Sequence, residues 1–110
     1  MAEERAHLVP GTLEMLVLKT LSLEPMHGFG IGERIQQMSR NVFWVNQGTL
    51  YPALERLQQQ GLIRAEWRMT ENNRRARYYL ITSTGVRRLE SARAEWERSA
   101  AAVNWILRTT

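Results

Sequence analysis

The 110-residue sequence contains no cysteine and no aspartate. The absence of cysteine excludes a disulfide framework and any thiolate metal site, and it fits a reducing compartment. His7 and His27 lie far apart in the chain, with no cysteine or aspartate to complete a metal site, so we expect both to be structural. No set of side chains forms a nucleophile, base or metal constellation. The sequence therefore predicts a protein that is not an enzyme and has no cofactor.

Long apolar runs are also absent. No segment reaches the roughly 20 apolar residues that a membrane-spanning helix needs. Residues 1–11 (MAEERAHLVPG) are acidic in part and lack the apolar stretch of a signal peptide. We therefore expect no membrane partner and a cytoplasmic location. The hydrophobic share of 44% is nevertheless high enough for one folded domain with a real core.

Lysine is nearly absent, since Lys19 is the only lysine among 15 basic residues. The planar donor fork of arginine suits phosphates and guanine edges, although a GC-rich genome explains the arginine bias equally well. The distribution of charge is more informative. Residues 1–33 hold two basic and five acidic residues, whereas residues 64–77 hold five basic and two acidic ones. A short basic segment of this kind is typical of proteins that bind a polyanion.

Helical spacing of apolar residues predicts two helices in the first forty residues. The first is expected near residues 13–23, with Thr12 as its N-cap and Pro25 beyond its end. The second is expected at about residues 28–39. The connection over residues 40–45 should tuck its larger apolar side chains, Val42, Phe43 and Val45, into the core.

A third helix is predicted near residues 47–60, with Asn46 as its N-cap and Gly61 ending it. Pro52 is awkward inside a helix, and a start at the proline is the alternative. We prefer the earlier start because Leu50 lies on the same apolar stripe as the leucines that follow. The side chains off this stripe face outward: Gln47, Thr49, Tyr51, Arg56 and Gln58.

Two strand-like stretches, residues 62–69 and 77–82, enclose a polar segment in which Asn72-Asn73 suit a tight turn. They predict a β-hairpin with a basic, exposed tip. Arg64 and Arg68 should face solvent or pair with glutamates. We expect the tryptophans of this region, Trp44 and Trp67, to pack in the core or on the hairpin.

The last element is one long helix over about residues 83–108, capped by Ser83 or Thr84. Its apolar residues follow alternating three- and four-residue steps, interrupted at Arg93. Such a stripe on a helix that leaves the domain has to pack on something, and a second copy of the helix is the best candidate. The expected homodimer seam includes Leu89, Trp96, Val103 and Leu107.

Three helices, a hairpin and a long helix, in that order, predict a mainly α fold with a two-stranded β wing (α+β), the winged helix-turn-helix. We divide the chain into a DNA-binding unit, residues 1–82 with a flexible stretch at 1–10, and a dimerisation helix, residues 83–110. The third helix would offer Gln47, Thr49 and Tyr51 to the major groove. The wing tip would offer Arg74, Arg75 and Arg77, the first two for affinity more than for sequence discrimination.

These motifs resemble the PadR family of bacterial transcriptional regulators. The resemblance rests on residues 48–54 (GTLYPAL) with Gly61-Leu62-Ile63 after them, and on residues 27–31 (HGFGI), where Phe29 replaces the commoner tyrosine. Trp67, the run 74–79 (RRARYY) and Gly85 extend it, so that it covers nearly the whole chain from Leu13 to about Leu107. The single short C-terminal helix is similar to that of the compact subgroup.

The resemblance implies a homodimer, usually a repressor, that binds a palindromic operator in double-stranded DNA through the third helix and the wing. It also implies that the C-terminal helices form the dimer. In some compact members the tryptophan that matches Trp96 stacks on planar aromatic molecules, so a small aromatic effector is a possible partner, although Trp96 as plain interface core is the alternative. A protein–protein adaptor without DNA binding is the competing function, and salt-sensitive duplex binding would separate the two.

Overall fold

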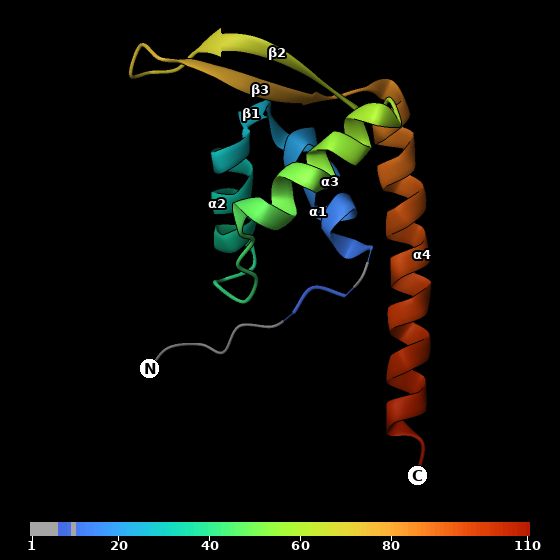
Figure 1. Ribbon diagram of the computed structural model, residues 1–110. Coiled ribbons are helices and arrows are strands. Elements are labelled where there is room, and N and C mark those ends of the chain that lie inside the picture. Colours follow the sequence, from blue (N-terminus) through green and yellow to red (C-terminus); the bar gives the residue numbers. More distant parts are fainter. Residues whose placement is uncertain (1–6, 10) are drawn as a thin grey trace.

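A computed structural model of the protein describes residues 7–9 and 11–110, and its elements follow the winged-helix order (Figure 1). The chain forms α1 (Thr12–Leu23), β1 (Met26–His27), α2 (Gly28–Met38), α3 (Gln47–Gln59), β2 (Ile63–Met69), β3 (Arg75–Ile81) and α4 (Ser83–Arg108). The three predicted helices, the hairpin and the long last helix are all confirmed. Flexibility was expected of residues 1–10. Of these, only residues 7–9 are among the described residues.

The core lies between α1, α2, α3 and the base of the hairpin. The α3 stripe is its centre, since Leu50, Leu54 and Leu57 are each 1% exposed. Burying one such side chain contributes about 1.5–3 kcal/mol, so this stripe fixes how α3 is rotated about its own axis. In the connection before α3, Phe43 and Val45 pack against this core only in part.

Both ends of α3 are as the sequence predicts. The Asn46 side chain accepts a hydrogen bond from the Thr49 N–H at 2.9 Å, so the helix begins before Pro52 and includes it. Gly61 has a φ of 73°, in the left-handed region that glycine adopts most easily, and the chain turns there into β2.

The predicted caps of α1 and α4 are wrong by one residue or more. Thr12 is the first residue of α1, and its hydroxyl donates back to the Val9 carbonyl instead of capping. The cap of α4 is Thr82, whose hydroxyl accepts from the Gly85 N–H at 3.0 Å. Residues 82–84 offer three neighbouring hydroxyls, and the end of β3 at Ile81 decides among them.

The sheet has three antiparallel strands in the order β1-β3-β2, one more than the two-stranded wing predicted. The added strand, β1, pairs Met26 with Tyr79 and His27 with Tyr78. Two residues are too few to show an alternating pattern, so the sequence gives no sign of this strand. Strand β3 also begins at Arg75, two residues earlier than predicted.

Helix α4 packs against α1 along its first turns and then continues past the rest of the molecule (Figure 1). Its first turn is held tightly, because Gly85 is buried against the Leu62 carbonyl and the Ile81 side chain. Its distal apolar side chains are exposed in the single chain, among them Val103, Trp105, Ile106 and Leu107.

We expect Gly85→Ala to destabilise the fold by at least about 2 kcal/mol, because the added Cβ would overlap the Leu62 backbone oxygen, which cannot move away as a side chain would. Urea denaturation followed by circular dichroism measures this loss. The matched control is Gly32→Ala in α2, where the Cβ would sit 3.5 Å from the Val45 carbonyl oxygen, an ordinary contact. The control should change stability by less than about 1 kcal/mol, and an equal loss in both variants would contradict the assignment.

Candidate nucleic-acid interface

The N-terminal turns of α3 present the side chains that the sequence assigns to DNA. Gln47, Thr49 and Tyr51 are all exposed, whereas Leu50 between them is buried. The Asn46 cap takes up only one of the N–H groups that an α-helix leaves without partners at its start. This end of α3 therefore combines free donors and the positive end of the helix dipole with exposed side chains, the features of an anion-binding helix terminus.

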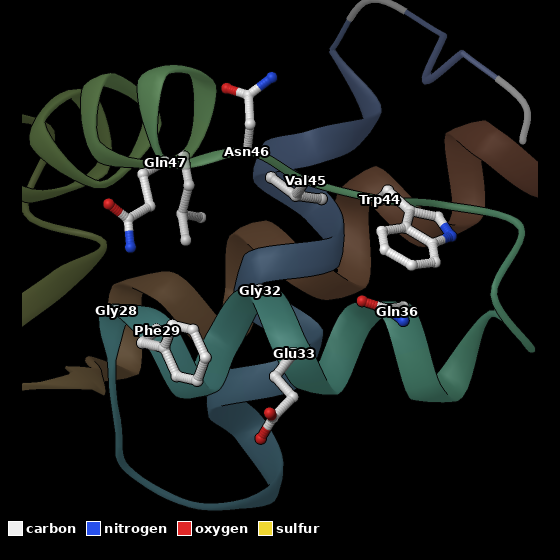
Figure 2. Close-up of a pocket in the computed structure, with 10 residues that line it drawn as sticks. Gly28, Phe29, Gly32, Glu33, Gln36, Trp44, Val45, Asn46 and Gln47 are labelled. Atoms are coloured by element: carbon white, nitrogen blue, oxygen red, sulfur yellow. The ribbon is translucent and has the colours of Figure 1, made fainter.

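A groove of about 340 Å³ runs beside this helix terminus, between α2 and the connection into α3 (Figure 2). Phe29 lies at one end near Gln47, and Trp44 lies at the other above Gln36. Phe29 is 60% exposed and Trp44 is 47% exposed. The expectation that Trp44 packs in the core is therefore wrong. It lies at the surface, where its indole N–H donates to the Asn41 carbonyl at 2.8 Å.

Tyr51 is packed on one side and open on the other. Its ring lies so close to the first residue of α2 that a Cβ at Gly28 would come within 2.5 Å of the Tyr51 hydroxyl. The side chain is nevertheless 42% exposed. The absence of a side chain at Gly28 thus leaves room for the Tyr51 ring, a relation between two helices that the sequence does not predict.

His27 is structural, as expected. Its Nδ1 accepts a hydrogen bond from the Gly30 N–H at 3.0 Å and caps α2, and its ring meets the Tyr78 ring edge-on at 5.5 Å. Within residues 7–9 and 11–110, no cluster of three or more His, Cys, Asp or Glu side chains is arranged to hold a metal ion. In the same residues no helix is long and apolar enough to span a membrane.

The hairpin has two faces of different character, which follow from the alternation of strand side chains. We call the inner face the one whose base packs on the core through Ile63 and Tyr79. Trp67 and Arg77 are paired across the strands on that same face, and Arg75 follows nearer the tip. Figure 1 shows the distal half of the hairpin reaching beyond the helices.

On the outer face two arginines share one carboxylate. Arg64 Nη1 lies 3.1 Å and Arg68 Nε 2.6 Å from the Glu66 oxygens, which confirms the expected pairing with glutamate. The hydrogen bond from Arg68 is the largest influence on the pKa of Glu66 and lowers it; desolvation opposes this, and the hydrogen bond from Arg64 adds to the lowering, so that the pKa lies below its ordinary value. Glu66 therefore stays ionised and offsets part of the positive charge on this face.

The inner face differs because its arginines meet an aromatic ring. Arg75 and Arg77 lie over the Trp67 indole, with their guanidinium carbons 4.8 and 5.8 Å from the ring centroid. Arg74 sits at the turn, exposed, with its backbone N–H donating to the Thr70 hydroxyl. The earlier expectation for Trp67 is confirmed only as hairpin packing, since the indole is 58% exposed.

Tyr79 marks where this inner face meets α3. Burial raises the pKa of Tyr79 above its ordinary value, the positive charge of Arg77 opposes the rise, and Tyr51 and Glu55 add to it. The backbone pairing places this position near Tyr51 of α3, because His27 pairs with Tyr78 and the Tyr51 ring lies against Gly28, the residue after His27. Tyr51 therefore lies near the base of the inner face of the wing.

The residues predicted to form the dimer seam differ in their solvent exposure in the single chain. Leu89 is half-buried and packs against the chain's own core. Trp96 is 42% and Val103 53% exposed, and Leu107 is 75% exposed near the end of α4. Trp96 also borders a hollow of about 420 Å³ between α4 and the start of α1.

Comparisons with known proteins agree with this architecture. The model of the transcriptional regulator PadR-like family matches residues 17–91. A transcriptional regulator from Clostridium thermocellum is 26% identical with a TM-score of 0.81, covering 89% of this chain and 95% of that one. A PadR-like regulator from Bacillus cereus is 27% identical with a TM-score of 0.80 over 91% and 95%. A PadR family regulator from Eggerthella lenta is 33% identical with a TM-score of 0.77 over 91% and 85%.

We expect Gly28→Ala to displace the Tyr51 ring at little cost in stability, because the obstructing atoms are the far end of a side chain that can rotate. Unfolding should change by less than about 1.5 kcal/mol, while the ring resonances of Tyr51 shift in the NMR spectrum. Gly32→Ala, one turn later in α2, is the control and should leave those resonances in place. Unmoved Tyr51 signals in a fully folded Gly28→Ala variant would refute the contact.

Proposed function

The chain belongs to the PadR-like family of transcriptional regulators and is a DNA-binding regulator, and from this we propose that it acts as a homodimeric repressor of an inverted-repeat operator. The family is one of regulators and not of enzymes. A cytoplasmic location goes with the proposal, because a repressor works where the chromosome is. The observation that carries the proposal is the two-sidedness of α3: its leucines are buried while its N-terminal polar side chains are exposed.

The reading role falls to Gln47, Thr49 and Tyr51. A B-DNA major groove admits one α-helix, and side chains on its first turns reach the base edges. Gln47 can pair with an adenine edge through its amide, and Tyr51 adds a hydroxyl and an aromatic surface. Support comes from the exposure of all three beside the cap of α3.

The wing role falls to Arg74, Arg75 and Arg77. Guanidinium groups bind phosphates through paired N–H donors, and such contacts add affinity for every sequence alike. Support comes from the exposure of these arginines and from the position of the base of the wing near Tyr51.

The dimer role falls to the distal part of α4. Trp96, Val103 and Leu107 repeat at helical spacing on a helix that has left the body of the chain, and water would otherwise cover them. Burying such a stripe against a second α4 is the direct way to remove it from water. A small planar aromatic effector is part of the proposal, supported by the exposed Trp96 indole beside its hollow.

Selection of duplexes from a random pool by the purified protein tests the proposal most directly. We expect enriched sequences with two inverted half-sites, spaced by about one helical turn (34–36 Å) or a multiple of it. Binding should weaken steeply with added salt. Recovery of no preferred duplex, together with salt-insensitive weak binding, would instead favour a protein–protein adaptor.

Replacing Arg74 and Arg75 with alanine should weaken binding to all duplexes and lower the salt dependence, the slope of log K against log salt, by about 2, one unit for each lost phosphate contact. Fluorescence anisotropy at several salt concentrations measures this slope. The control replaces Arg64 and Arg68, which removes the same charge from the outer face where Glu66 already engages both. Equal losses in the two variants would show that only net charge matters, against the proposed wing contact.

Val103→Glu should convert the dimer to a monomer, because it would bury two carboxylates against each other in the seam. Sedimentation velocity measures the oligomeric state, and affinity for the palindrome should fall more than affinity for an isolated half-site. Glu placed at Ala94, an exposed position on the opposite side of α4 from Val103, serves as the matched control. A Val103→Glu protein that stays dimeric would overturn the seam.

A further inference from the structure

We propose that Trp67 is a positioning residue of the wing, whose indole holds the guanidinium groups of Arg75 and Arg77 in the orientation with which they meet DNA. The inference rests on the proposed function, since it concerns the same wing. It gives a role to an aromatic side chain that core packing does not explain, because the indole is 58% exposed at the far part of a hairpin.

The strand register brings the three side chains together. Trp67 on β2 stands directly opposite Arg77 on β3, and Arg75 is the next residue of β3 on the same face, opposite Met69. Arg75 lies 4.8 Å and Arg77 5.8 Å from the indole centroid, both within the roughly 6 Å at which a cation and an aromatic ring attract. One ring therefore serves two cations.

These cations lie on the face that turns toward α3. The base of that face is the buried pair Ile63 and Tyr79. Tyr51 of α3 lies close to this base, because its ring lies against Gly28 and the preceding residue, His27, pairs with Tyr78. A duplex whose major groove held the start of α3 would therefore lie beside this face and not beside the outer one. The stacked arginines occupy the place where the wing would meet the adjoining backbone.

Stacking leaves the useful part of an arginine free. A guanidinium that stacks on a ring uses its flat face, which leaves the N–H donors along its edge able to bind a phosphate oxygen. Ordering a long side chain at an interface costs binding free energy, so an arginine that is already held loses less when DNA arrives. In the described part of the chain no ion pair engages Arg75 or Arg77, so a carboxylate does not compete with the phosphate.

The outer face offers the internal contrast. Arg68 also approaches an aromatic ring, that of Tyr78 at 5.6 Å, but it is at the same time bound to Glu66. Its Nε and one Nη face a carboxylate of the same protein, which competes with a phosphate for this guanidinium. In the described residues of the wing, Arg75 and Arg77 therefore differ from Arg68, because they lie over an aromatic ring without also pairing with a carboxylate.

The test compares two replacements of Trp67 that differ in one property. Leucine keeps an apolar side chain without a ring face, whereas phenylalanine keeps a smaller ring face. We expect Trp67→Leu to lower operator affinity about 3- to 10-fold and Trp67→Phe by no more than about 2-fold. Wild-type affinity in Trp67→Leu would overturn the proposal. Thermal unfolding of both variants, expected to match the parent because the site lies away from the core, guards against a loss caused by misfolding.

A double-mutant cycle separates positioning from direct contact. In a protein that already carries Arg75→Ala and Arg77→Ala, adding Trp67→Leu should cause no further loss, since the indole then has nothing to hold. Additive losses would mean that Trp67 touches DNA itself and would overturn the positioning role. If the arginine replacements alone leave affinity unchanged, the wing contact of the proposed function fails, and the positioning role fails with it.

The stack can also be observed without DNA. The Hε proton of Arg75 should be shifted upfield by the ring current of Trp67, and the shift should vanish in Trp67→Leu and persist in part in Trp67→Phe. An unshifted Arg75 proton in the parent protein would refute the stack whatever the DNA measurements show. Loss of affinity in the arginine variants with an unshifted proton would leave the proposed function standing and reject this inference alone.

Discussion

The burial of the α3 leucines is the constraint from which the rest of the structure follows. Leu50, Leu54 and Leu57 are almost fully removed from water, and a helix held by such a stripe has only one rotation about its axis that keeps them so. That rotation turns Gln47 and Tyr51 outward. The side chains that would read DNA are thus directed by residues that never meet it. The apolar positions of α3 thus stabilise the fold, and its polar positions are left for the proposed contact with DNA.

A second constraint joins α3 to the wing and to α4. The Thr82 hydroxyl donates to the Gly61 carbonyl at 2.7 Å and accepts from the Gly85 N–H, so one side chain ties the end of α3 to the start of α4. The Thr82 backbone N–H adds a bond to the Leu62 carbonyl at the start of the wing. The wing, α3 and α4 therefore meet within a few residues, and a displacement of one of them is passed to the other two.

Much of this arrangement was predictable, and what was missed has physical reasons. Helix α3 shows strong periodicity over several turns, and its cap at Asn46 is local chemistry, so both follow from the sequence. The choice of Thr82 as the cap of α4, among adjacent hydroxyls, depends on where β3 stops pairing. The stacking of Trp67 with Arg75 depends on the strand register, which a turn of uncertain length leaves open. The contact of Gly28 with Tyr51 joins two helices and has no signal in either alone.

The way α4 leaves the body of the chain carries a mechanical consequence. The helix has 26 residues and is therefore about 39 Å long, and its first turn is packed against backbone at Gly85 without spare room. The helix is thus held rigidly at its first turn and extends freely beyond it. A tilt of one degree displaces the far end by about 0.7 Å. In the proposed dimer, a small change in the angle between two α4 helices would therefore change the separation of the two α3 helices by ångströms. The range of half-site spacings that such a dimer accepts would then depend on how rigidly the first turn of α4 is held, at a position far from any base pair.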